Sequence, residues 1–174
     1  MSSSPTPPPT ATRDWLAASE DDTARLAQRL AAAMQADASL ADALLTLRGE
    51  LGAGKTTFVR HLLRALGVTG RIKSPTYALV EPYELPATPA WGGPLPAWHA
   101  DLYRFDDPRE WEDAGLRELF AGRGLKLVEW PDKAGPLLPM PDLDLLLRHT
   151  DDGGRHITLS ARSARGVALL DTAA

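Results

Sequence analysis

The chain has 174 residues, of which 44% are hydrophobic and 24% charged, a composition typical of a globular protein rather than a disordered or fibrous one. Its formal net charge of −4 argues against strong non-specific binding to a nucleic-acid backbone, which needs an excess of Lys and Arg. The absence of cysteine excludes disulfides, thiolate metal sites and a Cys nucleophile.

The first residues differ from the rest of the chain. Residues 1–12 are almost entirely Ser, Thr, Pro and Ala, which offer too little apolar surface to offset the entropy of ordering them. We therefore predict a disordered tail at 1–12 and a single domain at 13–174. No apolar run approaches the roughly 18 residues that span a bilayer, so we expect a cytoplasmic protein without membrane contact.

The chain then alternates between patterns typical of helices and of strands. Ser19 precedes apolar residues at helical spacing, and a short apolar run at 43–47 leads into a Gly-rich turn that favours a strand. Apolar residues recur at helical spacing from Phe58 to Leu66, where Gly67 ends the helix. We predict further strands at 77–83, 98–103, 125–128, 144–148 and 156–161, a helix from 108 to 120, and an exposed Pro-rich loop at 85–96.

This alternation predicts an α/β fold with a parallel central sheet flanked by helices. Residues 151–154, Asp-Asp-Gly-Gly, are typical of a hairpin turn between the last two strands. Antiparallel strands should therefore extend the sheet at an edge. The order of the strands does not follow from these patterns.

The turn after the strand at 43–47 matches the phosphate-binding pattern G-x-x-x-x-G-K-[ST] in full. It consists of Gly49, Glu50, Leu51, Gly52, Ala53, Gly54, Lys55 and Thr56. Glycines let backbone N–H groups surround phosphate oxygens, and the helix N-terminus adds partial positive charge. Lys55 would neutralise the β and γ phosphates, and the Thr56 hydroxyl would bind Mg²⁺. The alternative is a Gly-rich turn with a chance lysine.

A P-loop enzyme also needs a carboxylate at the end of a neighbouring buried strand. Glu129 is the best candidate for this Mg²⁺ ligand because it ends the apolar run at 125–128; the alternative is an exposed strand-end glutamate. Trp130 follows it and could flank the nucleotide or pack in the core. The P-loop and Glu129 together predict a site for ATP and Mg²⁺.

Other residues near strand ends could take part in hydrolysis. Asp101 could orient the attacking water or help bind the metal's waters, or it could cap a turn. Thr76 lies in a Ser-Pro-Thr turn that could sense the γ-phosphate or could be an ordinary turn. His99 has no second His at ligand spacing, so we expect it to pack or to hydrogen-bond locally rather than to bind metal.

Four motifs resemble those of the TsaE family, bacterial ATPases of tRNA threonylcarbamoyladenosine biosynthesis. They are the segments 49–57, 73–77, 99–104 and 128–131, which occur in the family's order within residues 19–161. Glu50 stands where the family often has Asp, and the loop at 85–96 looks longer than usual.

The resemblance implies particular roles for these residues. Lys55, Thr56 and Thr57 look like phosphate contacts together with the loop backbone at Leu51, Gly52, Ala53 and Gly54. Thr56 and Glu129 look like the Mg²⁺ ligands, and Asp101 looks like a residue that hydrolysis requires. Glu20 and Arg155 are similar to peripheral nucleotide contacts, although their local sequence is loose.

The resemblance also implies a function in a larger assembly. The modified adenosine lies next to the anticodon in tRNAs that read codons beginning with A. Expected partners are the transferase TsaD and its partner TsaB, with ATP hydrolysis resetting their complex and tRNA contacted mainly through it. Hydrolysis by the isolated chain is expected to be slow.

Three other functions fit parts of the pattern. A small-molecule kinase would need an Arg-bearing lid, and Arg123 is the only Arg in a lid-like Gly-rich loop. A GTPase that recognises guanine through an Asn-Lys-x-Asp motif is excluded, because the chain contains no asparagine. A non-hydrolysing adaptor would use Lys55, Asp101 and Glu129 for affinity alone.

Overall fold

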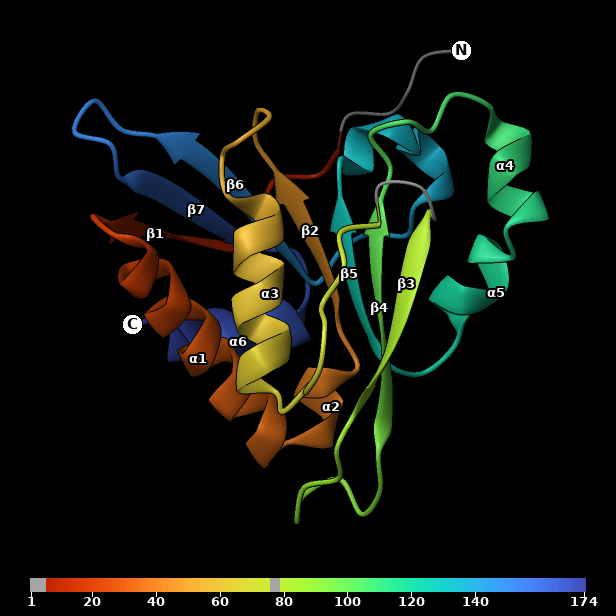
Figure 1. Cartoon of the computed structure of the whole chain (residues 1–174), viewed down its shortest axis with the longest axis horizontal. Coiled ribbons are helices and arrows are strands. Elements are labelled where there is room, and N and C mark those ends of the chain that lie inside the picture. The colour runs from red at the N-terminus through yellow and green to blue at the C-terminus, as the bar shows by residue number, and fades with distance from the viewer. Residues whose placement is uncertain (1–5, 76–78) are drawn as a thin grey trace.

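The computed structural model describes residues 6–75 and 79–174 and contains a seven-stranded sheet with helices packed against it (Figure 1). The strands lie in the order β1-β7-β6-β2-β5-β4-β3. Their bounds are β1 Ala11–Ala17, β2 Leu44–Arg48, β3 Val80–Leu85, β4 Leu95–Asp101, β5 Leu125–Glu129, β6 Leu143–His149 and β7 Arg155–Ala161. The β6-β2-β5-β4 centre is parallel, whereas β3, β7 and β1 join antiparallel. The predicted fold class, a P-loop-like α/β sheet extended by antiparallel edge strands, is confirmed.

Helices cover the two faces of the sheet unequally. They are α1 Glu20–Ala36, α2 Ala38–Ala41, α3 Lys55–Ala65, α4 Pro108–Asp113, α5 Leu116–Ala121 and α6 Ala164–Thr172, with short 3-10 turns at Pro131–Lys133 and Gly135–Leu137. The larger core cluster joins α1, α3 and α6 to one face through residues such as Leu45 and Leu47. Leu44 belongs to the second cluster, with Trp111 of α4 and Leu116 of α5. Because successive strand residues face opposite sides, the two clusters lie on opposite faces.

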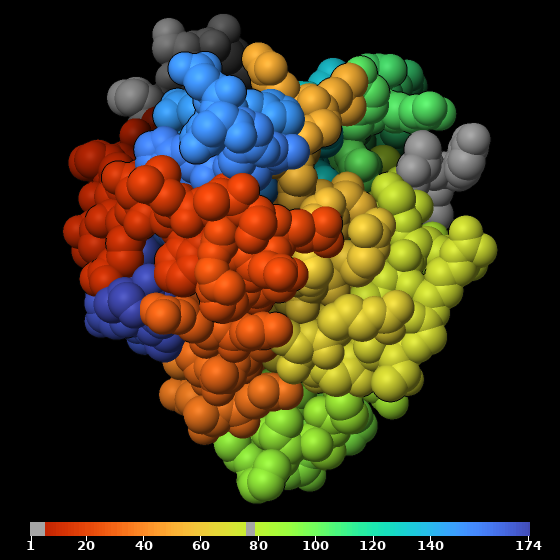
Figure 2. Space-filling view, turned by 60° about the vertical axis from the view of Figure 1, so that its left-hand side comes forward, coloured from red at the N-terminus to blue at the C-terminus, as the bar shows by residue number. Residues whose placement is uncertain are grey.

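The central strands are buried because helices or turns cover them. Every residue of β5 is buried, and so are the first four residues of β2, as expected for parallel strands inside a sheet. Ser19 precedes α1 and its backbone N–H donates to Asp22 at 3.0 Å, which satisfies one free group at the helix start. Figure 2 shows the α1 and α3 surfaces side by side, with the β6–β7 hairpin in blue above the start of α1.

Several predicted boundaries need correction. β1 begins at Ala11 and pairs with β7, so the last two residues of the predicted tail belong to the sheet. The predicted helix from 108 to 120 is two helices, because Gly115 adopts φ 67° between them. Helix α6 and strand β1 were not predicted at all.

The predicted exposed loop at 85–96 is also wrong at both ends. Leu85 and Leu95 are buried and directly opposite each other in the β3–β4 hairpin. In the connection between them, Trp91 donates its indole N–H to the Met34 carbonyl at 2.7 Å. The apolar residues at its two ends are therefore part of the core rather than of a loop.

In the described part of the chain, no helix has the length and apolar character that a membrane crossing requires.

Candidate functional site

The Gly-rich loop lies between β2 and α3, as the sequence predicts. Gly49, Gly52 and Gly54 adopt φ values of 147°, 80° and 103°, a region that L side chains rarely occupy. A Cβ on Gly49 would lie 2.6 Å from the Leu147 carbonyl oxygen of β6. This contact explains the glycine at the start of the loop. Gly54 then precedes α3, so the first N–H groups of that helix remain available to an anion.

Lys55 is the first residue of α3 and lies inside the loop. The residue is only 5% exposed, and Nζ donates to the carbonyls of Gly49 at 2.7 Å and Glu50 at 2.9 Å. The ammonium also lies 4.4 Å from the centre of the Trp130 ring. Burial lowers the pKa of Lys55, while the negative charges of Glu129 and Asp101 act in the opposite direction. A buried cation held by carbonyls would be stabilised by a phosphate group.

Thr56 meets Glu129 across the gap between α3 and β5. The Thr56 hydroxyl lies 2.9 and 3.1 Å from the two carboxylate oxygens of Glu129, a side chain that is 2% exposed. His99 contacts the same carboxylate, with Nε2 2.8 Å from Oε2. This bond links β4 to β5 across 30 positions of the chain, so it is not the local hydrogen bond that the sequence predicts. The structure brings the two predicted Mg²⁺ ligands together.

Asp101 ends β4 directly opposite Glu129 in the parallel register. The side chain is half-buried, and its Oδ1 accepts a hydrogen bond from the Tyr103 backbone N–H at 2.9 Å. Burial is the main reason that the pKa of Asp101 is raised; the Tyr103 hydrogen bond opposes it, and the charge of Glu129 adds to it. His99 and Lys55 lower the pKa by smaller amounts. A carboxylate with a raised pKa is a better proton acceptor than an ordinary aspartate.

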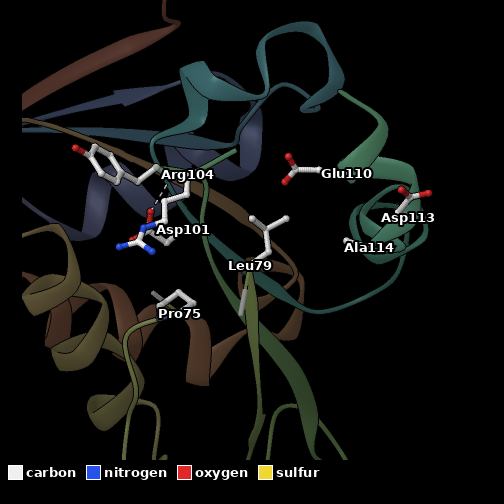
Figure 3. Close-up of a pocket in the computed structure, with 8 residues that line it drawn as sticks. Pro75, Leu79, Asp101, Arg104, Glu110, Asp113 and Ala114 are labelled. Atoms are coloured by element: carbon white, nitrogen blue, oxygen red, sulfur yellow. Dashed lines mark hydrogen bonds between the residues drawn. The ribbon is translucent and has the colours of Figure 1, made fainter. Parts of the chain in front are cut away.

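A cavity of about 510 Å³ opens beside Asp101. It is lined by Pro75, Leu79, Asp101, Tyr103, Arg104, Glu110, Asp113 and Ala114. Figure 3 shows Asp101 and Arg104 on one side of it and the α4 residues Glu110 and Asp113 on the other. The predicted residue Thr76 lies outside the described residues, between Pro75 and Leu79, which both line this cavity.

Trp130 has an unusual backbone conformation. It is the one non-glycine residue in the described part of the chain with a positive φ, 57°, a conformation that is strained for a bulky side chain. Its ring packs against Tyr103 at a centroid distance of 5.0 Å and against Lys55. Sequence reasoning missed Tyr103, although its place two residues after Asp101 was the available signal. Trp130 therefore connects the loop lysine with the end of β4.

A smaller cavity of about 180 Å³ lies on the other side of the loop. It is lined by Ala17, Ser19, Glu20, Thr23, Ala53, Gly54, Thr57, Leu147, Gly153, Gly154 and Arg155. Two predicted peripheral residues therefore meet the loop here, although Glu20 also contacts His61 Nε2 at 2.8 Å. Arg155 donates to the Ala53 carbonyl at 2.8 Å and to the Gly154 carbonyl at 2.9 Å, which ties the β6–β7 turn to the loop.

The predicted site residues that the structure describes thus follow one another around the loop and the neighbouring strand ends. Arg155 and Glu20 lie at one end, the loop with Lys55, Thr56 and Thr57 in the middle, and Glu129, Trp130 and Asp101 at the other. Leu51 is 65% exposed at the outer surface of the loop, so only its backbone is suited to contact a phosphate. Sequence reasoning missed Ser19, Thr23 and the β6–β7 turn as lining residues, since nothing local links them to the loop.

Comparisons with known proteins agree with this arrangement. The family model described as "Threonylcarbamoyl adenosine biosynthesis protein TsaE" matches residues 17–157. The protein of that name from Bacillus subtilis is 41% identical over 118 residues, which cover 68% of this chain and 69% of the relative. Its namesake from Haemophilus influenzae is 40% identical over 123 residues, covering 71% and 73%. The crystal structure of Bacillus subtilis YdiB superposes with a TM-score of 0.72 at 31% identity, covering 94% of each chain.

Proposed function

Because the chain belongs to the TsaE family, we propose that it serves tRNA threonylcarbamoyladenosine biosynthesis as an ATPase that binds ATP with Mg²⁺. The observation that carries the proposal is the convergence of four residues at the loop. Thr56 contacts Glu129, the charges of Glu129 and Asp101 both act on Lys55, and Asp101 and Glu129 lie opposite each other at two neighbouring strand ends. A phosphate-binding loop needs only the first two, whereas hydrolysis needs a metal ligand and a group that positions water.

The residues present fit a magnesium ion. Thr56 and Glu129 offer a hydroxyl and a carboxylate in contact with each other, and Mg²⁺ usually takes only one or two protein oxygens beside phosphates and waters. The described residues contain no group of three or more His, Asp or Glu that could hold a metal without a nucleotide. When bound, the ion would neutralise charge on the phosphate oxygens.

The chain's own residues would do the rest of the chemistry. Backbone N–H groups of the loop and of the start of α3 would hold the phosphates, with Lys55 leaving the carbonyls of Gly49 and Glu50 for phosphate oxygens. Asp101 would orient the attacking water and accept its proton, a role that suits its raised pKa. Glu20, Thr57 and Arg155 would contact the nucleotide from the smaller cavity.

The proposed biological role is the resetting of a transferase complex. We infer that TsaB and TsaD are the partners, and that ATP hydrolysis by this chain restores their complex between rounds of modification. The substrate of that complex would be the adenosine next to the anticodon in tRNAs that read codons beginning with A. A non-hydrolysing adaptor and a small-molecule kinase are the alternatives.

A reconstitution experiment tests this function. The purified chain alone should release phosphate from ATP slowly, and adding TsaB and TsaD from the same organism should raise the rate. Lys55→Ala should abolish the stimulated rate because it removes the phosphate-binding ammonium. Phosphate release that does not respond to the partners would contradict the resetting role, and ADP formation that depends on one small metabolite would favour a kinase.

A further inference from the structure

His99 is a buried polar residue that the proposed function leaves without a role. It lies in β4 opposite Leu127 of β5, and its side chain is 0% exposed. Nε2 lies 2.8 Å from Oε2 of Glu129. The other ring nitrogen, Nδ1, has no hydrogen-bond partner among the residues that the structure describes.

An imidazole in this position costs free energy that an apolar side chain would not. Burying a polar nitrogen without a partner is unfavourable, by about 1 to 3 kcal/mol for a typical group. A leucine is apolar and of similar size, so it would fill this buried position without leaving a polar nitrogen unpaired. Among the residues that the structure describes, the one hydrogen-bond partner that His99 gains in return is Glu129.

The chemistry of a metal ligand gives that hydrogen bond a direction. A carboxylate that binds Mg²⁺ is ionised and only accepts hydrogen bonds, so in the metal-binding state the proton on this bond belongs to Nε2 of His99. The Glu129 carboxylate thus contacts both His99 and Thr56, which lie on two different elements. The neighbouring carboxylate of Asp101 lies opposite Glu129 in the register. Without His99, nothing described on the β4 side fixes which way the Glu129 carboxylate turns.

We propose that His99 is a positioning residue that holds the Glu129 carboxylate toward Thr56, in the orientation that binds the magnesium ion of Mg²⁺·ATP. The proposal rests on the proposed function, since it concerns the same site. Residues that hold a metal ligand by a hydrogen bond commonly change metal affinity about 10-fold to 100-fold when replaced. His99 would therefore act on the metal-dependent part of nucleotide binding.

The matched variants are His99→Leu, which removes the donor, and His99→Gln, whose amide N–H₂ can reach the position of Nε2. Calorimetry would measure the affinity for a non-hydrolysable ATP analogue with MgCl₂ and with EDTA. We expect the gain in affinity due to Mg²⁺ to fall about 10-fold in His99→Leu and to be largely restored in His99→Gln. His156→Leu is the control, because His156 also contacts a carboxylate, that of Asp14 at 3.0 Å, and neither residue lines the two cavities beside the loop.

The outcomes separate the inference from the function on which it rests. An unchanged Mg²⁺ gain in His99→Leu, or an equal loss in both His99 variants, would overturn the positioning role. A parent chain that binds the analogue with no Mg²⁺ gain would overturn the proposed metal site and the inference together. Thermal unfolding and circular dichroism of each variant would identify any that fail to fold.

A spectroscopic measurement on the unmodified chain covers the case in which the variants fail to fold. Long-range ¹H–¹⁵N correlation spectra of the imidazoles would report which nitrogen of His99 carries its proton. We expect a protonated Nε2 that persists when Mg²⁺ and the analogue are added. A proton on Nδ1 alone, with Nε2 bare, would overturn the proposal because His99 could not then donate to Glu129.

Discussion

At the scale of single residues, the proposed role of Asp101 in hydrolysis comes with a cost to stability. Burial raises its pKa, so the folded chain holds this proton at pH values where the unfolded chain has lost it. The contribution of Asp101 to the free energy of unfolding is therefore most favourable at low pH, where the residue is protonated. It is lost as the pH rises through the pKa of Asp101 in the folded chain. At neutral pH the ionised Asp101, near Glu129, destabilises the fold.

Asp101→Asn should accordingly be more stable and less active than the parent chain. We expect a higher melting temperature at pH 7.5, with a difference that shrinks as the pH is lowered through the folded pKa of Asp101. ATP hydrolysis should fall by about 100-fold or more, since a group that accepts the proton of water has been removed. Differential scanning fluorimetry across pH and a phosphate-release assay would measure both effects.

The exposed Asp106 supplies the control for this experiment, because Asp106→Asn removes a nearby carboxylate that does not line the described cavities. Equal melting temperatures for Asp101→Asn and the parent at pH 7.5 would contradict the cost assigned to burial. Unchanged turnover would remove Asp101 from the hydrolytic step and favour the adaptor.

The individual site residues were largely readable from the sequence, but their partners were not. The P-loop pattern and the carboxylate after a buried run identify Lys55, Thr56 and Glu129 by residue type and context alone. The contact between His99 and Glu129 depends on how β4 and β5 are aligned, and register is not encoded locally. The positive φ of Trp130 was equally invisible, because tertiary contacts with Lys55 and Tyr103 accompany it.

At the scale of elements, the loop between β2 and α3 depends on two glycines in different ways. Gly49 needs both its backbone conformation and the missing side chain, since a Cβ would lie 2.6 Å from the Leu147 carbonyl and 3.0 Å from Ala53 Cβ. Gly52 needs only its conformation, because nothing lies within 4 Å of its Cβ position. Gly49→Ala should therefore be the more damaging replacement.

We expect Gly49→Ala to lower the free energy of unfolding by about 2 kcal/mol or more, since the β6 backbone cannot move away without breaking its ladder. Gly52→Ala should lower it by about 1 kcal/mol, the usual strain of a left-handed residue. Urea unfolding followed by circular dichroism would compare the two variants with the parent. Equal losses would show that the contact with Leu147 has little weight.

The elements that sequence reasoning missed are those held by distant partners. β1 pairs with β7, as in Ala11 opposite Ala161. Its apolar Leu16 is 74% exposed, so the order of apolar and polar residues does not show which side chains of β1 face the core. Helix α6 is short and follows the last predicted strand, with Leu169 and Leu170 buried against α1 and the sheet. Long elements with a strong local period, such as α1 and α3, were recovered because their apolar faces can be read directly.

At the scale of the whole molecule, the fold class could be predicted but the order of strands could not. Alternating strand and helix patterns favour a parallel centre, and the Asp-Asp-Gly-Gly turn indicates an antiparallel hairpin. The order of strands depends on which segments far apart in the chain pair with each other, and local sequence patterns do not report that pairing. In this chain β2 lies between β6 and β5, which follow it by many residues. That arrangement brings Glu129 to the loop.

The molecule's net charge leads to a prediction about tRNA. With a formal charge of −4, the isolated chain lacks the excess of Lys and Arg that releases counterions from phosphates. We expect it to bind tRNA weakly, with a dissociation constant above about 10 μM at about 150 mM salt. Fluorescence anisotropy with a labelled tRNA that reads a codon beginning with A would measure it.

The same titration with TsaB and TsaD present tests whether the proposed complex brings this chain to tRNA. Binding should tighten when the partners are added, and a tRNA without adenosine next to its anticodon provides the comparison. Submicromolar binding by the chain alone, weakening steeply as salt rises, would contradict the prediction, because it would require a basic surface that the overall composition does not suggest. Such a result would assign direct tRNA recognition to this chain and leave the partners with catalysis alone.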